Sequence, residues 1–90
     1  MARNERTFTI VNTLGLHARA AAQLVQTANR FRSEIHVEKD GMTVNGKSIM
    51  GVLTLAAAKG SLIAVSCEGE DADAAMAALA KIIENGFGET

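Results

Sequence analysis

The feature that most constrains the fold is a change of hydrophobic period across a short glycine-containing link that leads into His17. Residues 7–11 alternate polar and apolar side chains, which predicts a strand that is half-covered by helices and ends at Asn12. Residues 18–30 instead place apolar side chains every three or four positions, which predicts an amphipathic helix. We therefore expect His17 to lie at the N-terminus of that helix.

The N-terminus of a helix is a favourable place to bind an anion. The first N–H groups of a helix have no intrahelical partner, and the helix dipole adds partial positive charge there. Arg19 adds a planar fork of donors that fits phosphate oxygens, and the imidazole of His17 is a nucleophile. The pattern predicts a histidine that carries a phosphoryl group; the alternative is an ordinary capping or surface histidine.

Two motifs in register resemble the HPr family, the histidine-containing phosphocarriers of the bacterial phosphoenolpyruvate-dependent phosphotransferase system. Residues 15–19, Gly-Leu-His-Ala-Arg, resemble the active-site motif of that family. Residues 47–52, Lys-Ser-Ile-Met-Gly-Val, resemble its regulatory-serine segment. The likeness continues through the late strand and residues 69–71, so it covers nearly the whole chain.

The resemblance implies a carrier and not an autonomous enzyme. Enzyme I would phosphorylate His17 on Nδ1, with phosphoenolpyruvate as the original donor, and His17 would pass the group to a histidine of an EIIA-type protein. Arg19 would stabilise the phosphate, and Ser48 would be a regulatory site wherever the cell contains an HPr kinase/phosphorylase. The residues expected to contact partners are Leu16, Ala20, Lys47, Ile49, Met50 and Leu53.

One position departs from the family pattern. The family commonly has proline directly after the arginine, whereas this chain has Ala20 and contains no proline. Alanine is a good helix former and keeps an N–H donor in the first turn, so we expect function to be retained. The Asn-Thr-Leu-Gly-Leu-His segment and the Asn-Gly-Phe-Gly ending also resemble the nitrogen-regulatory branch, so the sugar-uptake and nitrogen-regulatory branches both stay open.

The remaining patterns predict a β-α-β-β-α-β-α order. Residues 34–39 and 42–45 read as a hairpin around Asp40-Gly41, residues 61–67 as the last strand, and Asp71 as the cap of a final helix followed by a loose tail at 86–90. We therefore expect an α+β fold, an open-faced two-layer sandwich of three helices on a four-stranded antiparallel sheet. The strand order 1-4-2-3 is implied by the resemblance, since pattern alone does not separate it from a ferredoxin-like order.

Ser48 is a good N-cap for a short helix over residues 49–55. That helix is apolar on nearly every side, whereas a helix on a sheet needs to bury only one stripe. The surplus predicts an exposed apolar patch. The resemblance implies that Ile49, Met50 and Leu53 belong to it, because the matching residues of HPr proteins line the partner surface near the active histidine. The alternative is a helix that is wholly buried.

Composition narrows the remaining classes of function. A net charge of −1 and only three aromatic residues argue against a nucleic-acid module. A single cysteine, Cys67, in an apolar strand fits a buried thiol in a reducing compartment, and the two histidines lack metal-ligand spacing, so no metal or cofactor is expected.

The N-terminus has no apolar signal region, and no segment approaches the ~20 apolar residues of a membrane span, so a cytoplasmic protein without membrane insertion is expected. We expect residues 1–90 to form one monomeric domain. The rival class is a small regulatory α+β module of the ACT kind, which would leave His17, Arg19 and Ser48 without a joint role.

Overall fold

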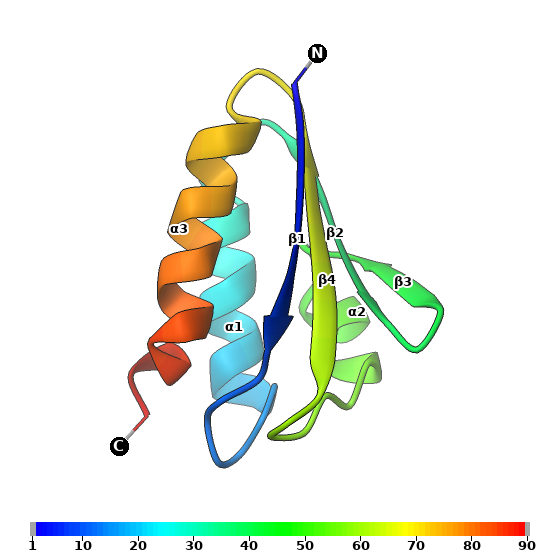
Figure 1. Cartoon of the computed structure of the whole chain (residues 1–90), viewed down its shortest axis with the longest axis vertical. Coiled ribbons are helices and arrows are strands. Elements are labelled where there is room, and N and C mark those ends of the chain that lie inside the picture. Colours follow the sequence, from blue (N-terminus) through cyan, green and yellow to red (C-terminus); the bar gives the residue numbers. More distant parts are fainter. Residues whose placement is uncertain (1, 90) are drawn as a thin grey trace.

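The computed structural model describes residues 2–89 and places helices on one face of a four-stranded antiparallel sheet (Figure 1). The strands are β1 (Arg3–Thr9), β2 (Glu34–Lys39), β3 (Met42–Asn45) and β4 (Leu62–Glu68), in the order β1-β4-β2-β3. The helices are α1 (Ala18–Ala28), α2 (Ile49–Thr54) and α3 (Ala72–Glu84), followed by the short 3₁₀ helix η1 (Gly86–Gly88). The α+β open-faced sandwich with order 1-4-2-3 is confirmed.

Alternation along the central strands fixes how the sheet is assembled. Val37 of β2 lies opposite Val65 of β4, and Ile35 lies opposite Cys67; all four side chains are buried under the helices. A shift of the pairing by one residue would turn these side chains to solvent, so burial of one face specifies the register. Leu24 of α1 belongs to the same core. The buried thiol of Cys67 is as predicted, and burial raises its pKa, with the charge of Asp71 adding to the effect.

The first strand lies earlier in the chain than predicted. β1 spans Arg3–Thr9 and pairs along its length with β4, so the prediction of a strand over residues 7–11 that ends at Asn12 is wrong in its bounds. Charged residues are tolerated at the start of β1 because it is an edge strand with one face open to solvent. The chain therefore leaves the sheet before the link, and Asn12 is buried outside any strand.

The predicted helix over residues 18–30 ends two residues earlier, at Ala28. Asn29 is its C-cap, and the Asn29 side-chain amide donates to the carbonyl oxygen of Val25 at 3.0 Å. The next two N–H groups, of Arg30 and Phe31, bond three residues back to Thr27 and Ala28, which tightens the chain into a turn.

Asp71 occupies the N-cap position of α3 as predicted, but its side chain does not cap the helix. Its carboxylate instead accepts hydrogen bonds from the Ser33 hydroxyl at 2.5 Å and from the N–H groups of Arg32 and Ser33 at 2.8 and 2.9 Å. The Ser33 hydroxyl bond, and then the Arg32 N–H, lower the pKa of Asp71. Asp71 thus ties the loop before β2 to the start of α3.

The prediction of a loose tail at residues 86–90 is wrong for the described part of it. Gly86, at φ +62°, turns the chain back, and Phe87 joins the core cluster. Glu89 then accepts hydrogen bonds from Asn12 and Leu14. Thr90 lies outside the described residues. Burial of Phe87 requires the chain to turn back toward the core after α3, and Gly86 permits that turn because glycine readily adopts positive φ.

Candidate functional site

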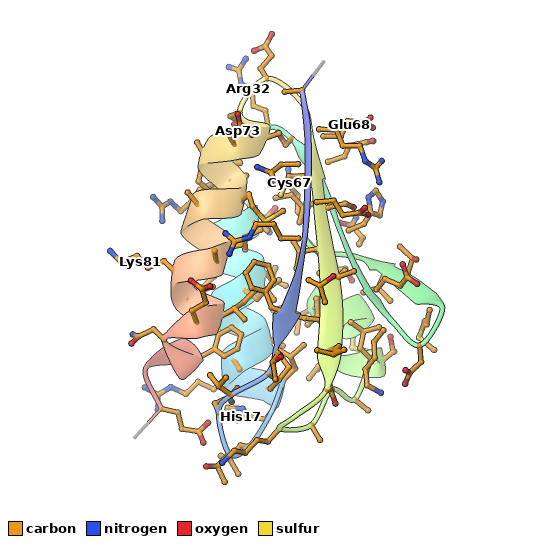
Figure 2. All side chains as sticks on the ribbon, viewed as in Figure 1. His17, Arg32, Cys67, Glu68, Asp73 and Lys81 are labelled. Carbon is orange, nitrogen blue, oxygen red and sulfur yellow. The ribbon has the colours of Figure 1, made fainter. Side chains whose placement is uncertain are left out.

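His17 is the N-cap residue of α1, as predicted, with extended backbone (φ −72°, ψ 178°). Its carbonyl oxygen accepts the Ala21 N–H at 2.8 Å, which is the first intrahelical bond. Its side chain makes no capping bond to the helix, and Nδ1 lies 3.1 Å from the carbonyl oxygen of Gly15. The half-buried imidazole sits at the end of the molecule where the link enters α1 (Figure 2).

The link before His17 is pinned to the segment that follows α2. Gly15 adopts φ +66°, and a Cβ at that position would lie 2.3 Å from the carbonyl oxygen of Ala57. That same oxygen accepts the Leu16 N–H at 2.8 Å. Only glycine fits this combination of left-handed backbone and close approach, so the position of His17 depends on it.

A cavity of about 290 Å³ opens beside the imidazole. Its lining includes His17 and Arg19, so the structure brings together the two residues that the sequence predicted. Arg19 is exposed in the first turn of α1, where its guanidinium can reach an anion bound at the helix N-terminus. The remaining lining residues are Leu14, Gln23, Phe87, Gly88 and Glu89.

Sequence reasoning missed the contribution of the C-terminal segment to this cavity. Both carboxylate oxygens of Glu89 are engaged: Oε2 accepts from Asn12 Nδ2 at 3.0 Å and Oε1 from the Leu14 N–H at 3.1 Å. The Asn12 bond, and then the Leu14 N–H and the charge of His17, lower the pKa of Glu89. The one signal that could have indicated this contact is Phe87, an aromatic residue in an otherwise polar tail.

Ser48 is the N-cap of α2, as predicted. Its hydroxyl oxygen accepts the Gly51 N–H at 3.1 Å, and the residue is half-buried. The ammonium of the preceding Lys47 donates to the carbonyl oxygen of Phe31 at 2.7 Å. Lys47 therefore ties the start of α2 to the turn after α1.

The helix that follows presents the predicted apolar patch. Met50 is 74% exposed, Ile49 is 43% exposed and Leu53 is half-buried, whereas Val52 is buried in the core cluster. The alternative of a wholly buried helix is wrong, because α2 has one buried stripe and its other faces reach solvent.

Two residues that the sequence analysis assigned to partner contact lie in the core instead. Leu16 is 4% exposed and Ala20 is 0% exposed. The pinned backbone turns Leu16 inward, and Ala20 lies one turn before Leu24 on the buried stripe of α1. Neither side chain offers surface to a partner. The exposed large apolar side chains of the loop between β1 and α1 are Val11, at 49%, and Leu14, at 64%.

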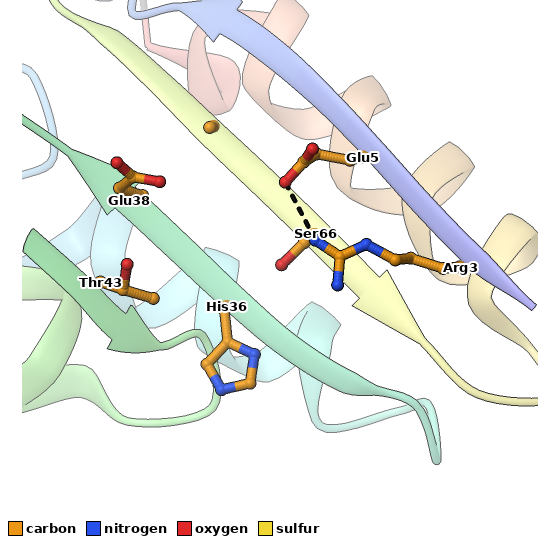
Figure 3. Close-up of a pocket in the computed structure, with 7 residues that line it drawn as sticks. Arg3, Glu5, His36, Glu38, Thr43 and Ser66 are labelled. Carbon is orange, nitrogen blue, oxygen red and sulfur yellow. Dashed lines mark hydrogen bonds and ion pairs between the residues drawn. The ribbon is translucent and has the colours of Figure 1, made fainter. Parts of the chain in front are cut away.

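A second cavity, of about 300 Å³, lies on the open face of the sheet (Figure 3). His36 lines it and is exposed, as predicted, with Arg3 and Glu5 forming an ion pair at 3.2 Å nearby. Among residues 2–89 no three His, Cys, Asp or Glu side chains are grouped to hold a metal ion. Within the same residues, every helix is too short or too polar to cross a bilayer.

The chain resembles known phosphocarriers over nearly its full length. Residues 4–85 match the PTS-HPr family, described as the PTS HPr component phosphorylation site. The phosphocarrier protein HPr of Xylella fastidiosa is 51% identical over 85 residues, which cover 94% of this chain and 96% of that protein.

Solved structures agree. HPr-C-His from Thermoanaerobacter tengcongensis superposes with a TM-score of 0.93 at 49% identity, covering 97% of this chain and 98% of that one. An HPr dimer from the same organism superposes with a TM-score of 0.78 at 50% identity, covering 96% and 99% of the two chains. This chain belongs to the HPr family of phosphocarrier proteins of the phosphotransferase system.

Proposed function

We propose that this protein accepts a phosphoryl group on His17 from phosphorylated enzyme I, ultimately from phosphoenolpyruvate, and passes it to a histidine of an EIIA-type protein. The observation that carries the proposal is the placement of His17 at the start of α1, with its imidazole free of capping duty and Arg19 lining the same cavity. Family membership supports the same reaction.

The transfer itself is a displacement at phosphorus. A lone pair on a His17 ring nitrogen attacks the phosphorus, a new N–P bond forms, and the bond to the donor group of enzyme I breaks with its electron pair. In the second transfer an EIIA histidine nitrogen attacks, and the N–P electron pair returns to His17. No metal or redox step is needed to balance either transfer.

The contact of Nδ1 with Gly15 sets a condition on the first transfer. A carbonyl oxygen only accepts hydrogen bonds, so Nδ1 carries the proton whenever that 3.1 Å contact is made. Attack by Nδ1, the nitrogen used in the family, therefore requires the ring to turn away from Gly15 and the proton to reside on Nε2. The half-buried, uncapped side chain permits this rotation.

The groups around His17 stabilise the negative charge of the incoming phosphoryl group. The free N–H groups at the start of α1 and the guanidinium of Arg19 stabilise the phosphoryl oxygens, in keeping with phosphoryl transfer that depends on positioning and electrostatics. The open cavity leaves the phosphoryl group accessible to the next acceptor. A deep, tight site would retain the group and slow its onward transfer.

We propose the exposed apolar patch on α2, Ile49, Met50 and Leu53, as the contact surface for enzyme I and EIIA-type proteins, with Lys47 at its edge. The patch is small, which suits short encounters. We also propose a single-domain, monomeric, cytoplasmic carrier that acts as a substrate of its partners and requires no cofactor, nucleic acid or membrane insertion. A regulatory module of the ACT kind is not favoured, because the family match covers residues 4–85.

The test is phosphorylation by enzyme I and phosphoenolpyruvate, followed by intact mass. Wild-type protein should gain the mass of one phosphoryl group and lose it in acid. His17→Ala should gain none, whereas His36→Ala, which removes the other histidine, should behave as wild type. A wild-type protein that gains nothing, or a His17→Ala variant that still gains an acid-labile group, contradicts the proposal.

A further inference from the structure

A continuous hydrogen-bonded path links Glu89 to His17. The Asn12 side-chain amide donates one hydrogen to Glu89 Oε2 at 3.0 Å and the other to the Gly15 carbonyl oxygen at 2.7 Å. That same oxygen lies 3.1 Å from His17 Nδ1. Asn12 is only 5% exposed, so the surrounding protein holds its side chain in place. Asn12 therefore bridges the C-terminal segment and the link.

The C-terminal segment is built to deliver this carboxylate. The Gly88 N–H bonds to the Asn85 carbonyl at 3.2 Å and the Glu89 N–H bonds to the Gly86 carbonyl at 3.0 Å. Phe87 between them is buried in the core cluster. Figure 1 shows the C-terminal end and the link before α1 at the same end of the molecule. Glu89 is therefore positioned by the fold and is not part of a free tail.

The docked carboxylate lies where a phosphoryl group would need room and positive charge. Glu89, His17 and Arg19 line one cavity. A phosphoryl group on His17 would carry close to two negative charges. The lowered pKa of Glu89 keeps its carboxylate ionised at neutral pH, so the two anions would repel each other and share one arginine.

We propose that Glu89 is an internal competitor of the phosphoryl group: its carboxylate is docked on Asn12 and Leu14 while His17 is unmodified and is displaced when His17 is phosphorylated. This inference rests on the proposed function. Because the coupling is reciprocal, docking of Glu89 must disfavour the phosphorylated form by the same factor by which phosphorylation disfavours docking. The competition would keep the phosphoryl group transferable.

The first test follows the Leu14 amide by ¹H–¹⁵N NMR, since that N–H bonds directly to Glu89. In wild type, phosphorylation of His17 should break the bond, so hydrogen exchange of the Leu14 amide should quicken to the rate seen in unmodified Glu89→Ala, which has no side-chain acceptor. An unchanged Leu14 resonance and exchange rate in a protein that is fully phosphorylated overturns the proposal.

The second test needs no enzyme I. Inorganic phosphate is titrated into wild type, Glu89→Gln and Glu70→Gln, with the amides of Ala18 and Arg19 as reporters. Glu89→Gln keeps the size of the side chain but removes its charge, and should bind phosphate about three- to tenfold more tightly. Glu70→Gln makes the same change of net charge in the exposed β4–α3 loop at the far end of the molecule, and should match wild type (Figure 1).

Equal affinity in all three proteins, no binding to any of them, or equal tightening in both variants overturns the competition. Failure of wild type to accept phosphate from enzyme I contradicts the proposed function, whereas the phosphate titration still decides the role of Glu89. Thermal melting of Glu89→Gln near that of wild type shows that the variant is folded.

Discussion

Gly15 and Ala57 approach so closely that a Cβ on the glycine would lie 2.3 Å from the alanine carbonyl oxygen. The two residues are 42 positions apart along the chain, yet their contact determines where His17 lies. The link is held between the segment after α2 and the start of α1. Its geometry is a property of the tertiary fold, and a change at Gly15 should affect stability and activity together.

Gly15→Ala should lower the free energy of unfolding by about 2–5 kcal/mol, since it adds both a left-handed backbone conformation for alanine and a steric clash with Ala57. Gly41→Ala is the matched control: Gly41 has φ +83°, but no atom lies within 4 Å of its added Cβ. It should lose only about 1 kcal/mol. Urea unfolding compares the two, and equal losses would contradict the steric explanation.

Asp71 should make the protein sensitive to acid. The pKa of Asp71 is lowered in the folded state, chiefly by the Ser33 hydroxyl and then by the Arg32 N–H. The ionised carboxylate therefore stabilises the fold at pH values above its ordinary pKa of 3.8, and this stabilisation is lost as the pH falls through the lower pKa of the folded state. The urea concentration at the midpoint of wild-type unfolding should therefore decrease as the pH is lowered below about 4.

The same profile for Asp71→Asn should be flatter in that range, because the variant has no carboxylate to protonate there. Asp40→Asn, in the exposed hairpin turn, serves as the control and should follow the wild-type profile. Parallel profiles for wild type and Asp71→Asn would show that the loop tie does not depend on the ionised carboxylate.

Arg19→Ala should slow phosphorylation of His17 by enzyme I by about tenfold or more while permitting some labelling, because the helix N–H groups remain. The expected change is mainly in kcat, since the guanidinium acts on the arriving charge. Arg3→Ala removes an exposed arginine at the far end of β1 and is the control for net charge. A rate for Arg19→Ala equal to that of Arg3→Ala would remove Arg19 from the site.

Met50→Ser should weaken docking of enzyme I without changing the chemistry at His17. Removing an exposed apolar side chain from an interface costs roughly 1–2 kcal/mol, which would raise KM about fivefold to thirtyfold with little change in kcat. Met42→Ser is a matched control, since Met42 is half exposed on β3 and lies outside the patch on α2. Equal KM values for the two variants would place the docking surface elsewhere.

Ser48→Asp tests whether Ser48 can act as a control point where a kinase exists. Aspartate is as good an N-cap as serine and can replace the bond to the Gly51 N–H, so melting should stay near that of wild type. The new charge beside Ile49 and Met50 should slow phosphorylation by enzyme I, through the cost of its desolvation and repulsion of acidic partner groups.

Ser48→Asn is the control, because asparagine is an equally good cap without charge. The rate for Ser48→Asn should match wild type at both low and physiological salt. If Ser48→Asp also matches wild type at both salt concentrations, Ser48 is a cap alone and the electrostatic switch is absent.

The local patterns of the sequence predicted most of the elements and the heart of the site. Alternation predicted the hairpin strands at residues 34–39 and 42–45 with the bounds that the structure has, and the change of period placed His17 at the start of α1. These features depend on side chains within a few positions of one another. Ser48 as a cap is another example, since its partner Gly51 is three residues away.

The tertiary structure alone decided which distant residues meet at the site. Periodicity reports which face of an element is buried, but Leu16 lies in an irregular link without a period, so its burial was not predictable from the pattern. Glu89 is 77 residues from Asn12 along the chain, and nothing in either local sequence encodes their contact. It exists because packing of α3 and Phe87 on the sheet brings the C-terminal segment back to the link, which places a negative charge beside the histidine.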